Sequence, residues 1–165
     1  MTGRLKTRIA ASMLGAVALA GVAIGVANAQ NAPAPSPTKV AIENRRAAYT
    51  LIGNSFRWFG AVVKGTVPYD AAEAKKRAER ISHLAAIPSE NFPEGSNAPE
   101  PDSKAKAEVW SNRADFDKKQ KEFVEHAAAF AQAISATSAA DDGFKAAVAS
   151  LGQDCKGCHD TYKAK

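Results

Sequence analysis

The chain has 165 residues, of which 45% are hydrophobic and 24% are charged, and this balance excludes an intrinsically disordered or fibrous protein. Its length is that of one globular domain with its own hydrophobic core. The formal net charge is +5, but the cations are dispersed and Lys75-Lys76-Arg77 is expected to be a solvated helix face. Nucleic acid is therefore not expected as a partner.

The first 29 residues have the pattern of a secretory signal peptide. Three cations lie near the N-terminus, an apolar run covers residues 9–26, and Ala27-Asn28-Ala29 matches the small-residue site at which signal peptidase cuts. An uncleaved anchor is the alternative, because the run is near the minimum length of a membrane span, but its many Ala and Gly residues make it weakly hydrophobic. We therefore expect cleavage before Gln30, export to the bacterial periplasm, and no membrane association afterwards.

Residues 30–37 are predicted to form an extended tether. Proline occupies every second position near its end, at Pro33, Pro35 and Pro37. From Thr38 onward, apolar residues recur at helical spacing, and no segment alternates with a period of two. The folded domain is therefore predicted to cover residues 38–165.

Two helices are predicted in the first part of this domain. The first covers about residues 39–64, where apolar and aromatic residues follow at steps of three and four until Gly65 and Pro68 stop the helix. The second begins after Asp70, whose side chain can cap the free amides while Glu73 reciprocates as in a capping box, and it ends at Pro88. The stretch 88–103 is predicted to be a loop.

Two further helices complete the predicted domain. The third starts near Ser103, with a break or bend around Ser111. Beyond the break, phenylalanine recurs every seven residues, at Phe116, Phe123 and Phe130. This spacing is typical of a seam between packed helices and favours a core role over a cofactor contact. The fourth helix is capped by Asp141 or Asp142 and has an apolar side, so we predict an all-α antiparallel four-helix bundle.

The fourth predicted helix carries a C-x-x-C-H motif, made by Cys155, Cys158 and His159, in a chain with no other cysteine. At 100° per residue, Cys158 lies about 60° to one side of Cys155 and His159 about 40° to the other side. The three side chains therefore project from one arc of the helix. That arc continues the apolar side, so two thiols and an imidazole are directed into the bundle.

Three chemistries use such a set of side chains. A redox-active dithiol usually lies at a helix N-terminus beside a βαβ pattern, whereas this motif lies deep in the last helix. A zinc ion would need a fourth ligand, and His83 and His126 are the only other histidines. The adjacent Cys158 and His159 can hardly both reach one tetrahedral ion. Covalent attachment of one haem c, in which the two thiols add across two vinyl groups and His159 binds the iron, fits both the motif and the export.

The other side of the iron is predicted to lack a strong protein ligand. Met1 and Met13 are the only methionines, and both leave with the signal peptide, so a His/Met iron is excluded after cleavage. The iron is then five-coordinate, or His83, His126, a lysine or water fills the open side. The two histidines lie on polar, charged stretches, which is typical of surface histidines.

Three segments resemble the cytochrome c′ family, a class of exported high-spin haem proteins with four helices. They are LGQDCKGCHDTYK in the fourth helix, RRAAYTLIGNSF in the first and EVWSNRADF at the start of the third. The resemblance covers residues 38–165 and rests mainly on the motif, its C-terminal position and the number of helices. It implies that Arg45 lies near a haem propionate and that Tyr49 lies over the vacant face of the haem. The alternatives are a surface cation for Arg45 and a core aromatic for Tyr49.

Two residues depart from the family pattern. Lys163 stands where members often have an arginine, and it can neutralise a propionate but cannot bind it bidentately. Tyr49 is larger than the leucine of many relatives, so it should crowd a distal pocket that we expect to be apolar and without a hydrogen-bond donor. Small gases would have to displace Tyr49, and NO and CO should be favoured over O₂.

The sequence therefore predicts a periplasmic haem protein that binds small gases, especially NO, at a five-coordinate high-spin iron and that can transfer electrons. The alternative is a simple electron-transfer cytochrome with an incidental open site and a redox partner that the sequence does not identify. An enzyme such as a peroxidase is not expected, because that chemistry requires a distal His or Arg over the iron. The resemblance also implies a homodimer formed through the first two helices.

Overall fold

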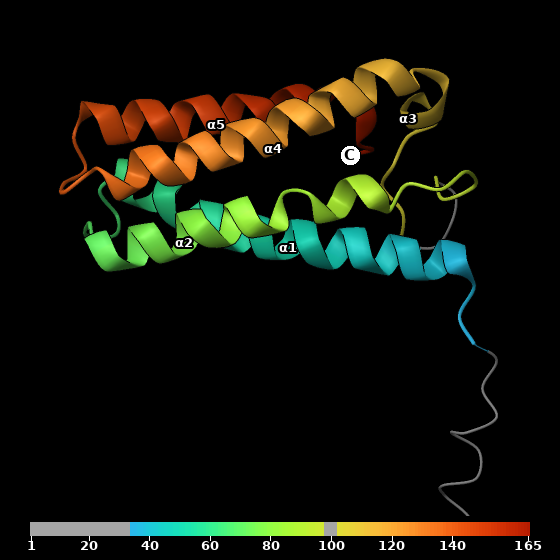
Figure 1. Ribbon diagram of the computed structural model, residues 1–165, viewed down its shortest axis with the longest axis horizontal. Coiled ribbons are helices and arrows are strands. Elements are labelled where there is room, and N and C mark those ends of the chain that lie inside the picture. The colour runs from blue at the N-terminus through green and yellow to red at the C-terminus, as the bar shows by residue number, and fades with distance from the viewer. Residues whose placement is uncertain (1–33, 98–101) are drawn as a thin grey trace, which may run out of the picture. The chain divides into compact units, whose positions relative to one another are not determined.

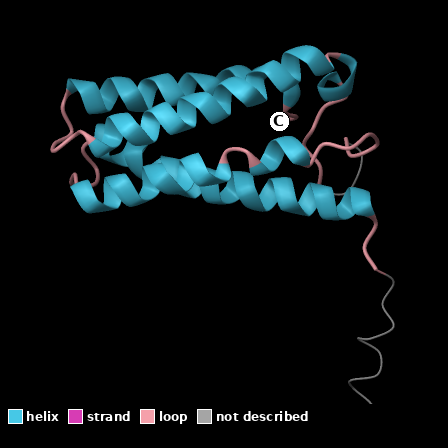
Figure 2. Ribbon diagram, viewed as in Figure 1, coloured by secondary structure: helices cyan, strands magenta, loops and turns pink. Residues whose placement is uncertain are grey.

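The computed structural model describes residues 34–97 and 102–165 (Figure 1). The predicted signal peptide, residues 1–29, and the start of the predicted tether lie outside the described residues. The described part contains five α-helices and one 3₁₀ helix, with no strand (Figure 2). These are α1 (Pro37–Val63), α2 (Ala71–Leu84), η1 (Ile87–Glu90), α3 (Glu108–Ser111), α4 (Arg113–Ser135) and α5 (Asp142–Tyr162). Among these helices, none is both long and apolar enough to cross a membrane.

The first helix begins two residues earlier than predicted. Ser36 Oγ accepts a hydrogen bond from the backbone N–H of Lys39 at 3.2 Å, and Pro37 is the first helical residue. Proline is favoured at this position because the first amides of a helix have no partner within it. The last proline of the predicted tether is therefore the start of α1. The helix stops before Gly65, which has a φ of 71° and so adopts the left-handed conformation that favours glycine.

The helices α2 and α5 begin at the predicted caps. Asp70 and Asp141 each accept a hydrogen bond from the backbone N–H three residues later, at 2.7 Å and 2.8 Å. The predicted return bond from Glu73 to the cap of α2 is wrong. Its carboxylate accepts instead from Lys76 Nζ and Arg77 Nε, both at 2.7 Å, because these longer cations lie one turn away on the same helix face.

The connection between α2 and α4 differs most from the prediction. The second helix ends at Leu84, and η1 forms part of the expected loop. The expected helix start near Ser103 is wrong, because the chain at Ala105 is extended and forms an isolated antiparallel bridge with Lys163. This bridge buries Ala105 against the end of α5. The predicted break is confirmed, since Asn112 separates the single turn of α3 from α4.

The four long helices form the bundle that the sequence predicts. Helix α2 packs against α1 and α4, and α4 packs along α5. Figure 1 shows α4 and α5 running side by side above α1 and α2. The main core includes Phe59, whose ring centroid lies 4.9 Å from that of Phe130 and 5.9 Å from that of Phe144. A second core joins Phe116 and Tyr162 to the segment before α4.

Candidate functional site

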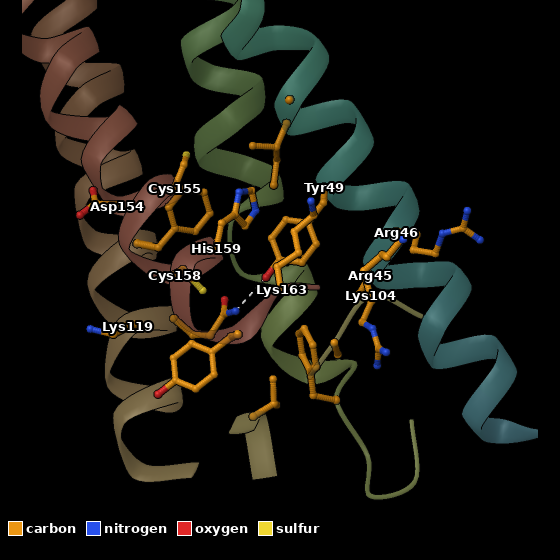
Figure 3. A pocket seen from close by; sticks show the side chains of 18 of the residues that line it. Arg45, Arg46, Tyr49, Lys104, Lys119, Asp154, Cys155, Cys158, His159 and Lys163 are labelled. Atoms are coloured by element: carbon orange, nitrogen blue, oxygen red, sulfur yellow. Dashed lines mark hydrogen bonds between the residues drawn. The ribbon is translucent and has the colours of Figure 1, made fainter. Parts of the chain in front are cut away.

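A cavity of about 510 Å³ lies between α1, α4 and α5 (Figure 3). Its walls are mostly apolar, with Ile52 and Phe56 on α1 and Phe116 and Phe123 on α4. Two members of the predicted phenylalanine seam therefore line the cavity, in addition to any role in the core. All six residues assigned to the site from the sequence also line it: Arg45, Tyr49, Cys155, Cys158, His159 and Lys163. The fold brings together residues that are more than 100 positions apart in the chain.

Cys155, Cys158 and His159 lie on the side of α5 that faces the cavity (Figure 3). Both cysteines are half-buried free thiols. Burial raises the pKa of the Cys155 thiol and raises that of Cys158 to about 11, so both thiols remain protonated at neutral pH. A redox-active dithiol requires a lowered thiol pKa, so this environment does not support that interpretation. Nor do three His, Cys, Asp or Glu side chains gather as metal-ion ligands anywhere in the described residues, which gives no support to zinc.

The imidazole of His159 is suited to bind a metal as a neutral ligand. Partial burial and the nearby Lys163 lower the pKa of the ring below its usual value, so one ring nitrogen keeps a free lone pair at neutral pH. The other two histidines do not line the cavity. His83 borders an exposed groove beside α2, and His126 Nδ1 lies 2.9 Å from Asp154 Oδ2 on the surface.

Arg45 is a buried residue, so its interpretation as a surface cation is wrong. Its side chain is 4% exposed. The Nη1 group donates to Asn91 O at 2.9 Å and Ser96 Oγ at 2.7 Å, and the Nη2 group donates to Ser96 O and, at 2.9 Å, to Ser103 Oγ. The guanidinium carbon also lies 4.5 Å from the ring centroid of Phe92. All four hydrogens on the terminal nitrogens thus go to the segment that follows η1, and the expected contact with a propionate remains a prediction.

Other cations stand at the mouth of the cavity. Arg46, Lys104 and Lys163 line it together (Figure 3). Arg46 is exposed and pairs with Asp102 at 3.3 Å, while Lys104 Nζ donates to the backbone O of Lys165 at 3.3 Å. Sequence reasoning missed Arg46 and Lys104. The RR pair in the first helix was a signal for Arg46, whereas Lys104 reaches the cavity only through the bridge between its segment and the end of α5.

Tyr49 extends from α1 into the cavity, where its hydroxyl meets Gln120 of α4. Gln120 Nε2 donates to Tyr49 Oη at 2.8 Å. Gln120 is 5% exposed and lines the same cavity. The expectation of a pocket without a hydrogen-bond donor is therefore wrong. Gln120 was missed because the seam was interpreted only through its phenylalanines, although a glutamine between Phe116 and Phe123 on that side of the helix was a signal.

These residues fit a covalently attached haem. The cavity has the size of a cofactor site and largely apolar walls, as a porphyrin ring requires. Two protonated thiols and a neutral imidazole come from one helix, as attachment and axial ligation require. Cations at the mouth suit the acidic propionate groups of a haem.

Comparisons with known proteins agree with this chemistry. A family model described as Cytochrome C' matches residues 40–163. Cytochrome c' from Alcaligenes xylosoxydans xylosoxydans is 35% identical over 125 residues, which are 76% of this chain and 94% of that protein. Cytochrome c' from Rubrivivax gelatinosus is 37% identical over 126 residues, which are 76% of this chain and 95% of that protein.

Solved structures show the same similarity. Cytochrome c prime from Shewanella frigidimarina has a TM-score of 0.72 and 41% identity, and the match covers 81% of this chain and 100% of that chain. A ferrous arginine-to-lysine variant of cytochrome c prime from Alcaligenes xylosoxidans, with bound NO, has a TM-score of 0.68 and 35% identity, over 81% of this chain and 99% of that chain. The chain therefore belongs to the cytochrome c′ family, whose members bind one covalent haem c.

Proposed function

We propose that this chain is a periplasmic haem protein that binds small gases, especially NO, at a five-coordinate high-spin iron. The observation that carries the proposal is that one cavity is lined by the C-x-x-C-H motif and by Tyr49, with no other histidine in its lining. Cys155 and Cys158 would hold the haem through thioether bonds, and His159 would bind the iron. When bound, the haem supplies the iron to which NO and CO bind.

The surroundings of the cavity support an open sixth position. His83 and His126 lie outside the lining, and the described residues contain no methionine. Among the remaining cations, Lys119 Nζ lies 3.7 Å from Asp115 Oδ1, and Lys104 is bonded to the C-terminal backbone. Each of these two amines therefore already has a partner of its own.

Tyr49 supplies the steric discrimination in this proposal. Ile52, Phe56 and Phe123 form apolar walls beside Tyr49, and the phenol ring of Tyr49 reduces the space left for a ligand. A gas that binds iron strongly can offset the cost of moving this ring, whereas a weak ligand cannot. Relatives with bound NO support NO as the gas, since one neighbouring structure has bound NO and another is a nitrosyl complex of a cytochrome c prime variant.

Electron transfer is the second candidate function. The exposed mouth of the cavity carries Arg46, Lys104 and Lys163, and a basic edge of this kind suits docking of an acidic redox partner. We do not propose an enzyme. The side chains of Tyr49 and Gln120 occupy the region where a peroxidase needs a distal His or Arg, and the guanidinium of Arg45 is bound to the backbone and serines of another segment.

We also propose a homodimer formed through α1 and α2. Four large hydrophobic side chains are exposed in the described residues: Val40, Leu51, Val63 and Ile87. Three of them lie on α1, and Leu51 borders the groove that faces α2. At 100° per residue, Val40 and Leu51 share one face of α1, and a second copy of the chain packed on that face would cover them. Sedimentation of the mature protein over a range of concentrations tests this proposal, and a monomer throughout would contradict it.

Optical and EPR spectra of the purified mature protein, oxidised and reduced and with NO, test the main proposal. We expect a high-spin spectrum that changes on addition of NO. In Tyr49→Ala, gas affinity and the rate of CO binding should rise by at least about tenfold if the ring obstructs the site. A low-spin spectrum that does not change on addition of NO or CO would instead favour the simple electron carrier.

A further inference from the structure

The hydrogen bond between Tyr49 and Gln120 crosses the candidate site. Tyr49 belongs to α1 and Gln120 to α4, and 71 residues separate them in the chain. Helix α1 packs mainly on α2, whereas α4 packs on α2 and α5. The bond thus joins two helices across the cavity that both residues line.

The surroundings of the Gln120 amide make this bond hard to replace. Gln120 is 5% exposed, and its Oε1 atom has no hydrogen-bond partner in the part of the chain that the structure describes. Breaking the hydrogen bond of a buried amide in apolar surroundings costs free energy unless the amide finds another partner. If Tyr49 turned away, Nε2 would also lose its partner, and the whole amide would be unpaired. The native position of the Tyr49 ring is therefore favoured by Gln120 as well as by packing.

We propose that Gln120 is a positioning residue that holds Tyr49 in the cavity, so that an incoming gas must break the Gln120–Tyr49 hydrogen bond before it can bind. This inference rests on the proposed function, in which Tyr49 obstructs the open side of the iron. It adds that the site is obstructed by the hydrogen bond from Gln120 of α4 as well as by the bulk of the Tyr49 ring. Gas selectivity then depends on Gln120 as well as on Tyr49.

Two substitutions separate the hydrogen bond from the bulk of the ring. Tyr49→Phe keeps the ring and removes the hydroxyl, and Gln120→Leu keeps a side chain of similar size and removes the amide. In both holoprotein variants, CO should bind the reduced protein about two- to tenfold faster in stopped-flow absorbance, because one ordinary protein hydrogen bond contributes a factor of this size. The double variant should be no faster than the faster single variant, since both changes remove the same bond.

Matched controls are a tyrosine and a glutamine elsewhere in the chain. Tyr69→Phe removes a tyrosine hydroxyl that donates to Thr137 O at 2.9 Å, away from the cavity lining. Gln132→Leu changes an exposed glutamine on α4. Neither control should alter the rate of CO binding. An equal acceleration in Tyr69→Phe would overturn the proposal, because it would trace the effect to general loosening of the fold.

A second readout does not depend on gas binding. Each single variant leaves one buried polar group unpaired, whereas the double variant replaces both groups by apolar ones. In urea unfolding of the holoproteins, the double variant should therefore be more stable than the sum of the two single losses predicts. Tyr69→Phe combined with Gln120→Leu should be additive, since these residues share no contact. Additive losses in the Tyr49 and Gln120 pair would contradict the proposed bond.

The outcomes also distinguish the two proposals. If Tyr49→Ala binds CO no faster than the natural protein, the obstruction by Tyr49 fails and the role of Gln120 fails with it. If Tyr49→Ala is much faster but Tyr49→Phe and Gln120→Leu are unchanged, the obstruction is purely steric. In that case only the role of Gln120 is overturned.

Discussion

Tyr162, the last residue of α5, donates a hydrogen bond from its hydroxyl to Asp115 Oδ2 in the first turn of α4. Asn112 Nδ2 donates to the same hydroxyl at 3.2 Å. The ring is 3% exposed and packs edge-on against Phe116, with the two centroids 5.2 Å apart. Helix α5 carries the C-x-x-C-H motif, and these contacts fix its end to the start of α4. Tyr162 lies one turn after His159.

Alkaline pH should weaken the fold through Tyr162. Burial and the hydrogen bond to Asp115 raise the pKa of its phenol from 10.0 to about 12. The folded state therefore holds this proton more tightly than the unfolded state, so the stability from this group is complete below pH 10 and is lost as the pH rises to about 12. Urea midpoints should fall more steeply over this range for the natural protein than for Tyr162→Phe. That variant should be about 1 kcal/mol less stable at neutral pH, and parallel slopes would contradict the assignment.

Replacing Arg45 by Ala should destabilise the protein strongly. Its guanidinium is buried and bonded to Asn91, Ser96 and Ser103, and removal leaves these acceptors without their donor. We expect a loss of about 3 kcal/mol in the free energy of unfolding, together with faster proteolysis between α2 and α3. Arg46→Ala is the matched control, because Arg46 is exposed with one ion pair and its loss should cost less than about 1 kcal/mol. Equal losses in the two variants would show that the contacts of Arg45 contribute nothing specific.

Substitutions in the motif should separate attachment of the haem from ligation of its iron. The double change of Cys155 and Cys158 to Ser should abolish covalent attachment, seen as loss of haem mass from the denatured chain. Either single change should leave one thioether bond and shift the pyridine haemochrome spectrum. In His159→Ala the haem should stay attached to the chain, because both thiols remain available. The spectrum of the iron should change, because its protein ligand is lost. Covalent haem in the double variant would refute the assigned attachment.

Export predicts a specific mature N-terminus. Cleavage after Ala29 should give a periplasmic protein that starts at Gln30, and intact mass measurement of the periplasmic fraction tests this directly. Ala29→Asp should block cleavage, since signal peptidase requires a small residue there, and should leave the longer chain at the membrane. A full-length chain that carries haem in the periplasm would contradict the predicted cleavage.

Local patterns in the sequence predicted much of the fold. The caps at Asp70 and Asp141 act within three residues of the chain, so residue type and spacing are enough to locate them. The arc shared by Cys155, Cys158 and His159 follows from helical periodicity alone. The same local reasoning failed for Glu73, where two nearby cations compete for the carboxylate, and for the start of the third helix, where a bridge to Lys163 overrides helix formation.

The sequence by itself determined the helical bundle, the motif and its side of the last helix, because these depend on interactions between residues within a few turns. Only the tertiary structure decided that Arg45 binds the segment after η1, that Lys104 reaches the mouth of the cavity, and that Gln120 meets Tyr49. Such contacts join residues 46 to 71 positions apart. Their partners depend on how the helices pack and on where buried polar groups can be satisfied, and no local pattern carries that information.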